Sequence, residues 1–499
     1  MHAFLWFASL TLLLLSIKLV IPKRSSLRLP PSPWKLPLIG NLHLLGLLPH
    51  RSLDKLAKKH GPLMLVKLGQ VPTLVLTSSE MVREAMKTHD LNFANRPILR
   101  AAEILFYGGK DMGFAPYGEH WRQMRKICVI NLFSAKRVQS FKAAREEEVA
   151  HLMDKISQAC SLHPLEPLNM SQLLNLFSND MICRALMGKF SGEEGRNILF
   201  HKLIEESIVL LSGFNFVDYF PSLGWLSSFL GLDERAKRNS SDWDAVLCQI
   251  IHERRAIRNG EKTKDDGFVD ILLSLQKDPN LEISLTDEII KALLMDLFGA
   301  GIDTTYIALE WSMAELVKNP QIMRKLQDEV REIACGKLIV KEEDLNKMSY
   351  LKSVIKEVLR LHPPAPLLVP RESVDSCQIE GYDIPRKTRV IINYWSIARD
   401  PKTWDSPDEF RPERFIDNPI DFKGQDYEYI PFGSGRRICP GMQFAISTIE
   451  LALANLVYQF DWKLVGDMVP EEIDMTESPG LTMRMKNNLY LVANSCSVP

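Results

Sequence analysis

Apolar residues recur at helical spacing along most of the chain from Ser79 onward. Residues 61–77 instead alternate β-branched residues with turn formers, a pattern that is typical of a short hairpin. A second minor sheet component is expected near residues 374–393. No internal repeat and no linker divides the chain after its N-terminal part. The pattern therefore predicts a mainly α protein with a minor β component and one large domain.

The longest predicted helix covers Ser284 to Val317. Ser284 and Asp287 stand three residues apart, as in a capping box, and Asn319-Pro320 is expected to end the helix. About 30 residues at 1.5 Å each span roughly 45 Å, which is long enough to run through the core of a large domain.

The middle of this helix, Ala300-Gly301-Ile302-Asp303-Thr304-Thr305, is unusual for a buried segment. Glycine there costs roughly 1 kcal/mol against alanine, and a buried carboxylate without a partner costs more. Two interpretations stay open on these residues alone. In one, Asp303 reaches a solvent pocket and the threonines bond to backbone carbonyls. In the other, small residues widen a groove where dioxygen can sit, and Asp303 and Thr304 guide protons to it.

Composition and charge are ordinary for a globular protein. Apolar residues make up 46% and charged residues 25%, and the formal net charge of −1 gives no argument for binding nucleic acid. The eight cysteines include no Cys-x-x-Cys pair, so they indicate neither a zinc site nor a disulfide framework. This cysteine usage suits a reducing compartment.

The N-terminal run from Ala3 to Ile21 is largely apolar, and about 19 residues are just enough to cross a bilayer. A cleaved signal peptide is the alternative, but no Lys or Arg precedes the run. Lys23, Arg24 and Arg28 follow it, which predicts that the rest of the protein faces the cytoplasm. We expect a transmembrane anchor at residues 1–21, a basic and proline-rich linker at 22–33, and a catalytic domain at 34–499.

A glycine-rich segment, residues 432–441, surrounds a single cysteine. Gly433 and Gly435 allow a sharp turn, and Pro440 suits the first turn of a helix whose apolar positions follow it. Cys439 would then lie at a helix N-terminus, where the dipole favours a thiolate. A thiolate is an axial ligand of haem iron, whereas the alternative is a buried structural cysteine in a turn.

The same segment contains the motif Phe-x-x-Gly-x-Arg-x-Cys-x-Gly, with Phe432, Gly435, Arg437, Cys439 and Gly441 at its fixed positions. It resembles the cysteine-ligand loop of the cytochrome P-450 superfamily, the haem-thiolate monooxygenases. The resemblance extends over essentially the whole chain, and its details are most similar to the plant microsomal A-type group, the 71 clan. It implies the cytochrome P-450 fold.

The resemblance implies haem b with its iron bound by the Cys439 thiolate, and dioxygen and NADPH-derived electrons as co-substrates. Asp303 and Thr304 match the family's oxygen-activation motif and would be catalytic. Trp121 and Arg125 match a helix that contacts a haem propionate, although a solvated basic face with one buried indole is the alternative. The full set of implied haem contacts is Arg96, Trp121, Arg125, Ala300, Arg371, Phe432, Gly435, Arg437, Cys439 and Gly441.

Further implied residues are structural or line the substrate pocket. Glu357 and Arg360 resemble a family ion-pair network with Arg414, although the Glu-x-x-Arg spacing alone is weak evidence, since it also begins at Glu80, Glu119 and Glu193. The implied substrate-lining residues, for each of which core packing is the alternative, are Ile104, Phe106, Phe114, Leu297, Ala300, Leu367, Leu368, Val369 and Leu481.

No Gly-x-Gly-x-x-Gly dinucleotide motif is present, so electrons are expected from a separate protein. The resemblance implies NADPH–cytochrome reductase, with cytochrome b5 as a second candidate partner, and a single-pass location in the endoplasmic reticulum membrane. The expected activity is insertion of one oxygen atom into a small hydrophobic plant metabolite of terpenoid, phenolic, coumarin or alkaloid type. The alternatives are a reductase-independent dehydratase or isomerase on the same haem fold, and a non-enzymatic haem carrier or sensor.

Overall fold

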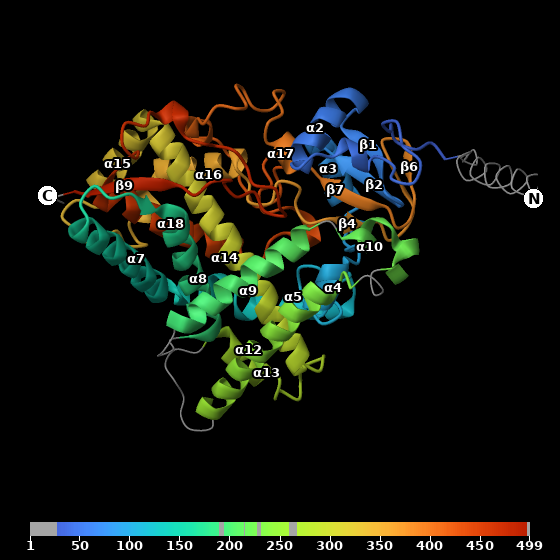
Figure 1. The fold of residues 1–499 in the computed structure, drawn as a ribbon, viewed down its shortest axis with the longest axis horizontal. Coiled ribbons are helices and arrows are strands. Elements are labelled where there is room, and N and C mark those ends of the chain that lie inside the picture. Colours follow the sequence, from blue (N-terminus) through green and yellow to red (C-terminus); the bar gives the residue numbers. More distant parts are fainter. Residues whose placement is uncertain (1–26, 189–193, 214, 227–230, 259–266, 497–499) are drawn as a thin grey trace, which may run out of the picture.

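The fold is predominantly helical with a minor sheet component, as the sequence predicts (Figure 1). The computed structural model describes residues 27–188, 194–213, 215–226, 231–258 and 267–496. The predicted anchor at residues 1–21 and the first part of the predicted linker lie outside these described residues.

Helix α14, Asp287–Lys318, is the central helix (Figure 1), and most of its residues are buried. It begins later than predicted, because Thr286 rather than Ser284 is the N-cap, and the Thr286 side chain accepts a hydrogen bond from the Ile289 amide. The predicted end is confirmed, since Pro320 opens the next helix. Among the described residues, α14 is the one helix long and apolar enough to cross a membrane, but it is buried in the core.

Fifteen other α-helices surround α14 in the described part of the chain. They are α2 (Pro49–His60), α3 (Ser79–Arg83), α4 (Arg100–Leu105), α5 (Glu119–Asn131), α6 (Ala135–Ser140), α7 (Lys142–Leu162), α8 (Met170–Met187), α9 (Glu194–Ser212), α10 (Phe216–Tyr219), α12 (Glu234–Arg258), α13 (Phe268–Leu275), α15 (Pro320–Ile333), α16 (Ser349–Leu361), α17 (Tyr394–Ile397) and α18 (Met442–Gln459).

The main sheet lies toward one end of the molecule and joins distant parts of the chain (Figure 1). Strands β1 and β2 form the hairpin predicted at residues 61–77, and β7 lies parallel to β2, with β4 beyond it. The strands are β1 (Leu63–Leu68), β2 (Val71–Leu76), β7 (Arg389–Ile392) and β4 (Arg371–Glu372) in this sheet, and β3 (Leu168–Asn169), β5 (Cys377–Ile379), β6 (Tyr382–Ile384), β8 (Phe460–Lys463) and β9 (Tyr490–Ser495) elsewhere.

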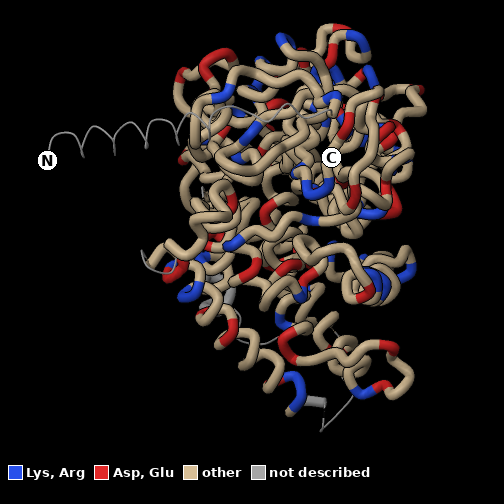
Figure 2. Tube along the Cα trace, turned by 90° about the vertical axis from the view of Figure 1, so that its right-hand side faces the viewer, with Lys and Arg blue, Asp and Glu red and all other residues tan. Residues whose placement is uncertain are grey.

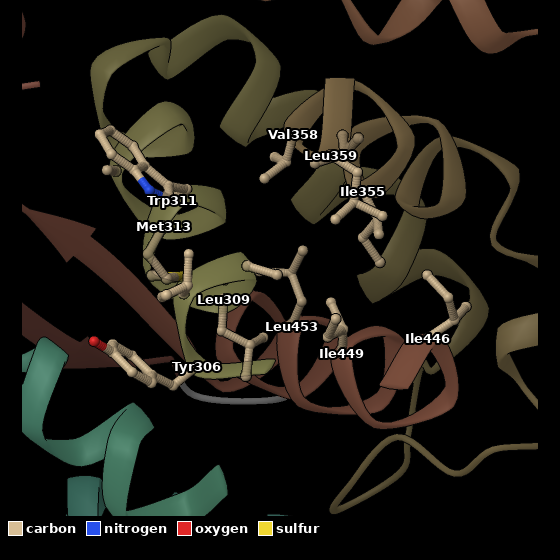
Figure 3. Close-up of a cluster of buried hydrophobic side chains, with 14 of the residues drawn as sticks. Tyr306, Leu309, Trp311, Met313, Ile355, Val358, Leu359, Ile446, Ile449 and Leu453 are labelled. Carbon is tan, nitrogen blue, oxygen red and sulfur yellow. The ribbon is translucent and has the colours of Figure 1, made fainter. Parts of the chain in front are cut away.

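Helices α14, α16 and α18 pack together through one apolar cluster (Figure 3). Figure 3 shows Leu309 of α14, Leu359 of α16 and Leu453 of α18 among its side chains, and all three are almost fully buried. Burial of a large aliphatic side chain stabilises the fold by about 1.5–3 kcal/mol. This cluster therefore fixes the three helices relative to one another.

Charges of both signs are interspersed along the described chain in the view of Figure 2. This distribution accords with the formal net charge of −1.

A buried ion-pair network fixes α16 to the loop that follows α17. Glu357 accepts hydrogen bonds from Arg360 at 2.7 and 2.9 Å and from Arg414 Nε at 3.0 Å. Glu357 and Arg360 are fully buried. Arg360 also donates to the backbone carbonyls of Ala398, Pro407 and Glu409. The network thus holds an irregular segment whose carbonyls would otherwise lack partners.

The change Glu357→Gln should lower the free energy of unfolding by about 3–5 kcal/mol, because it leaves two buried guanidinium groups without their carboxylate. The matched control is Glu119→Gln, since Glu119 pairs with Arg122 at the same i, i+3 spacing on the exposed surface. Urea unfolding measures both variants. Similar losses in the two would contradict a special role for the buried network.

Candidate active site

One cavity of about 290 Å³ brings together segments that are far apart in the sequence. The centre of α14 forms one wall and the segment around Cys439 forms another. The rest of the lining comes from α5, α8, α16, α18, residues 364–371, and the loop residues Arg96, Met112, Gly113, Leu132 and Phe133. Most of the lining is apolar, which suits a hydrophobic ligand. Of the predicted haem contacts, all but Trp121 and Gly435 line this cavity.

The cysteine segment turns back on itself before α18 begins. The Cys439 amide donates to the Phe432 carbonyl at 2.9 Å, which closes the turn. Gly435 has φ +69°, and a Cβ there would lie 2.4 Å from Asp90 Oδ1, so this position requires glycine. The helix begins at Met442 and not at Pro440 as predicted, because Gly441 is the N-cap residue.

The Cys439 side chain is accessible from the cavity, although protein surrounds it. Burial raises the pKa of the thiol, whereas the backbone amides of Gly441 and Met442 and the Arg125 guanidinium act to lower it. Thus the amides at the start of α18 do face the sulfur, as the predicted helix N-terminus requires. An anionic sulfur bound to a metal ion would keep these stabilising contacts.

Three buried arginines, Arg96, Arg371 and Arg437, line the same cavity. Their hydrogen bonds within the described residues go to backbone carbonyls, for example from Arg371 Nη2 to Ser434 at 2.8 Å and from Arg437 Nη2 to Ala115 at 2.7 Å. Within the described residues, none of the three forms an ion pair with a carboxylate.

Burial is the main cause that lowers the pKa of each of these arginines, to about 10 for Arg371 and about 9 for Arg437. For Arg96 the pKa lies well below its usual value, and the charges of Arg371 and Arg437 lower it further. Arginine nevertheless stays charged in proteins. The cluster is therefore a positive site that would be stabilised by an anionic ligand such as the two propionates of haem.

Trp121 of α5 lies behind this cluster and does not line the cavity. Its Nε1 donates to the Met112 carbonyl at 3.0 Å, so this N–H is already used within the protein. The guanidinium of Arg437 lies over the Trp121 ring, 4.2 Å from its centroid, and that of Arg125 lies at 5.8 Å. Trp121 therefore supports the arginines through cation–π contacts.

The unusual middle of α14 is divided between two faces of the helix. Thr304 lines the cavity, and its hydroxyl donates to the Ala300 carbonyl at 2.7 Å. Asp303 points elsewhere, since its Oδ1 accepts a hydrogen bond from Arg484 Nη2 at 2.6 Å. Burial raises the pKa of Asp303, and Arg484 acts in the opposite direction. The bond from Thr304 to a backbone carbonyl agrees with the structural interpretation of this segment. The position of the same hydroxyl at the cavity wall is what the functional interpretation requires.

Gly301 serves the packing of α14 against α8. A Cβ at Gly301 would lie 2.6 Å from Ile182 Cδ1, whereas one at Gly299 would meet nothing within 4 Å. The close approach of the two helices at this point therefore depends on the missing side chain.

The predicted substrate-lining residues divide into two groups. Leu297, Ala300, Leu368 and Val369 line the cavity, and Leu368 does so with a left-handed φ of +50°. Phe106 and Phe114 stack on each other at 5.6 Å between centroids. Those that lie outside the cavity lining are Ile104, Phe106, Phe114, Leu367 and Leu481.

Two residues that the sequence analysis did not select belong to this region. Asp296 lines the cavity, and Arg484 pairs with Asp303. The spacing of Asp296, Ala300 and Thr304, four residues apart, was an available signal, because such residues share one helix face. Arg484 lies far from α14 in the sequence, so no local pattern indicated its contact.

Comparison with known proteins gives a consistent result. The cytochrome P450 family profile matches residues 30–492. Cytochrome P450 71A1 of Persea americana is 50% identical over 458 residues, which cover 91% of each chain. Strychnine-11-hydroxylase of Strychnos nux-vomica is 49% identical, over 94% of this chain and 92% of its own. Phenylacetaldehyde oxime monooxygenase of Prunus mume is 47% identical over 473 residues, which cover 94% of this chain and 90% of its own.

The glycine pair of α14 gives a test of the helix contact. Gly301→Ala should lower the free energy of unfolding by about 1–3 kcal/mol, because the new methyl group overlaps Ile182. Gly299→Ala is the matched control and should raise it by about 0.5–1 kcal/mol, because alanine favours helix and the space is open. The double variant with Ile182→Val should recover part of the loss. Equal effects at the two glycines in urea unfolding would refute this account.

Proposed function

The chain belongs to the cytochrome P450 family and is a haem-thiolate monooxygenase of the plant 71 type, and on this premise we propose that Cys439 is its metal ligand. The observation that carries the proposal is the convergence on one cavity of the Cys439 thiol and three buried arginines that form no ion pair in the described part of the chain. When bound, the haem supplies the activation of dioxygen with NADPH-derived electrons and the transfer of one oxygen atom to substrate.

Arg96, Arg371 and Arg437 would hold the two haem propionates, since all three are buried and none forms an ion pair with a carboxylate among the described residues. Arg125 acts nearer the cysteine, where its Nη2 donates to the Ile438 carbonyl at 2.6 Å. Phe432, Gly441 and Ala300 line the cavity and supply apolar or backbone surface for the macrocycle, with no charge to desolvate. Gly435 acts indirectly, because it permits the turn.

Thr304 and Asp303 would handle protons on two different faces of α14. Thr304 Oγ1 is at the cavity wall and holds a proton that it now donates to the Ala300 carbonyl. Asp303 is buried, but its partner Arg484 is partly exposed and also approaches Glu205 at 4.0 Å. This chain of polar groups connects Asp303 with the surface, and a water molecule would have to join Asp303 to Thr304.

The substrate would be a small hydrophobic plant metabolite of terpenoid, phenolic, coumarin or alkaloid type. The apolar cavity side chains support this class, in particular Leu297, Leu368 and Val369. The names of two relatives, a strychnine hydroxylase and an oxime monooxygenase, indicate chemistry on specialised metabolites within the same family.

Electrons would come from NADPH–cytochrome reductase, with cytochrome b5 as a second donor. Residues 1–21 would anchor the protein in the endoplasmic reticulum membrane as a single span, residues 22–33 would form the linker, and residues 34–499 the catalytic domain on the cytoplasmic side. The apolar run and the basic residues that follow it support this arrangement.

Cys439→Ala should abolish the strongly red-shifted Soret band that the reduced, carbon monoxide-bound protein shows when iron is bound to a thiolate. The control is Cys183→Ala, since Cys183 is buried in α8 outside the cavity lining. This control should keep the band. A red-shifted band in folded Cys439→Ala would refute the ligand assignment.

Thr304→Ala should raise the hydrogen peroxide formed per NADPH consumed, because it removes the hydroxyl proton from the cavity wall. Thr304→Ser keeps the hydroxyl and should stay close to the unmodified enzyme. Both ratios are measured during turnover with purified reductase. If the alanine and serine variants release equal amounts of peroxide, Thr304 has no role in proton transfer.

A further inference from the structure

The segment Met112–Gly113 lies between α14 and the arginine cluster. On one side its two amide groups donate to the same atom, Asp296 Oδ2, at 3.2 Å from Met112 and 2.9 Å from Gly113. Asp296 belongs to α14, and its side chain is only slightly exposed and lines the cavity. One carboxylate of the central helix therefore fixes two consecutive peptide units of a loop.

The carbonyls of the same segment accept hydrogen bonds from two of the arginines that would hold the haem and from Trp121, which lies behind them. The Met112 carbonyl accepts from Trp121 Nε1 at 3.0 Å and from Arg437 Nη1 at 3.3 Å. The Gly113 carbonyl accepts from Arg96 Nε at 3.0 Å. The segment thus connects the Asp296 side chain of α14 to two of the three arginines, and it does so through its own backbone amides and carbonyls.

We propose that Asp296 is a positioning residue for haem binding, which it serves by holding the Met112–Gly113 carbonyls that orient Arg96 and Arg437. The inference rests on the proposed function, in which these arginines bind the propionates. It assigns Asp296 no contact with the reacting atoms. Groups behind the direct ligands of a cofactor commonly fix its orientation in this way.

The charge of Asp296 suits this task. Hydrogen bonds to a carboxylate are stronger than those to a neutral acceptor, so the two amides are held firmly. Burial raises the pKa of Asp296 to about 6, whereas the amides and the charges of Arg96 and Arg437 act to lower it. The neighbouring Asp111 accepts from the Phe114 amide at 2.5 Å and helps to shape the same loop.

Gly113 provides a second observation on the same contact. A Cβ at this position would lie 2.8 Å from Asp296 Oδ1, closer than carbon and oxygen can approach without displacement. The close contact between this loop and α14 therefore depends on glycine, and alanine would push the loop and the carboxylate apart.

The test measures the rate at which haem passes from the purified full-length holoenzyme to apomyoglobin, without reductase or substrate. Asp296→Leu removes the acceptor at similar volume and should release haem at least about tenfold faster. Asp296→Asn keeps an oxygen that can accept from both amides but lacks the charge, so its rate should lie between those of the unmodified protein and Asp296→Leu.

The matched control is Glu310→Leu. Glu310 is another buried carboxylate of α14, but it accepts from Ser171 of α8 and does not line the cavity. This variant should lose thermal stability without faster haem release. If Asp296→Leu releases haem no faster than Glu310→Leu, Asp296 is a residue of the fold only and the inference is wrong.

Gly113→Ala keeps the test decisive if Asp296→Leu does not fold. It should release haem faster than the unmodified protein, and an unchanged rate would overturn the inference. Failure of the proposed function would look different, because the unmodified protein would then bind no haem through Cys439 at all.

Discussion

The active site depends on positive charge that is buried without a carboxylate partner. Arg96, Arg371 and Arg437 come from three separate segments, and backbone carbonyls satisfy their N–H groups. A carbonyl accepts a hydrogen bond but carries no net charge, and the nearby carboxylates of Asp90, Asp111 and Asp296 form no ion pair with these arginines. The desolvation of the three guanidinium groups is therefore only partly offset within the described protein. An anionic cofactor on the cavity side would offset the remaining charge, which would couple the stability of the region to cofactor binding.

The fold provides the rigid surroundings that such a site requires. Arg371 is fixed on edge strand β4, and Arg437 is fixed by the short turn before Cys439. Helix α16 uses one side for the Glu357 ion pairs and another for Leu359, which reaches both the apolar cluster and the cavity wall. A substitution that loosens strand β4, the turn before Cys439 or the Glu357 ion pairs would therefore change the shape of the cavity, even though it replaces no residue of the cavity lining.

Helix α14 lines the cavity, forms a partly buried ion pair and packs closely on α8, and it uses different faces for these three tasks. The cavity face presents Asp296, Ala300 and Thr304, while Asp303 turns to Arg484 and Gly301 turns to Ile182. The glycine that the sequence analysis associated with an oxygen groove thus also has a packing requirement. Small and polar residues in the centre of this helix serve the contact with α8 as well as the cavity.

The sequence by itself determined the fold class, the hairpin at residues 61–77, the end of α14 and the family, because these depend on local periodicity, turn residues and a specific motif. It also indicated the arginines and Cys439 that the structure brings to one cavity. Only the tertiary structure decided which side chains meet across long separations, such as Arg484 with Asp303 or Asp296 with the Met112–Gly113 segment. It likewise decided that Thr286 caps α14 and that Leu367 and Leu481 lie outside the cavity lining. The reason is that a side chain's partner depends on how elements pack, and sequence spacing specifies only the face of its own element.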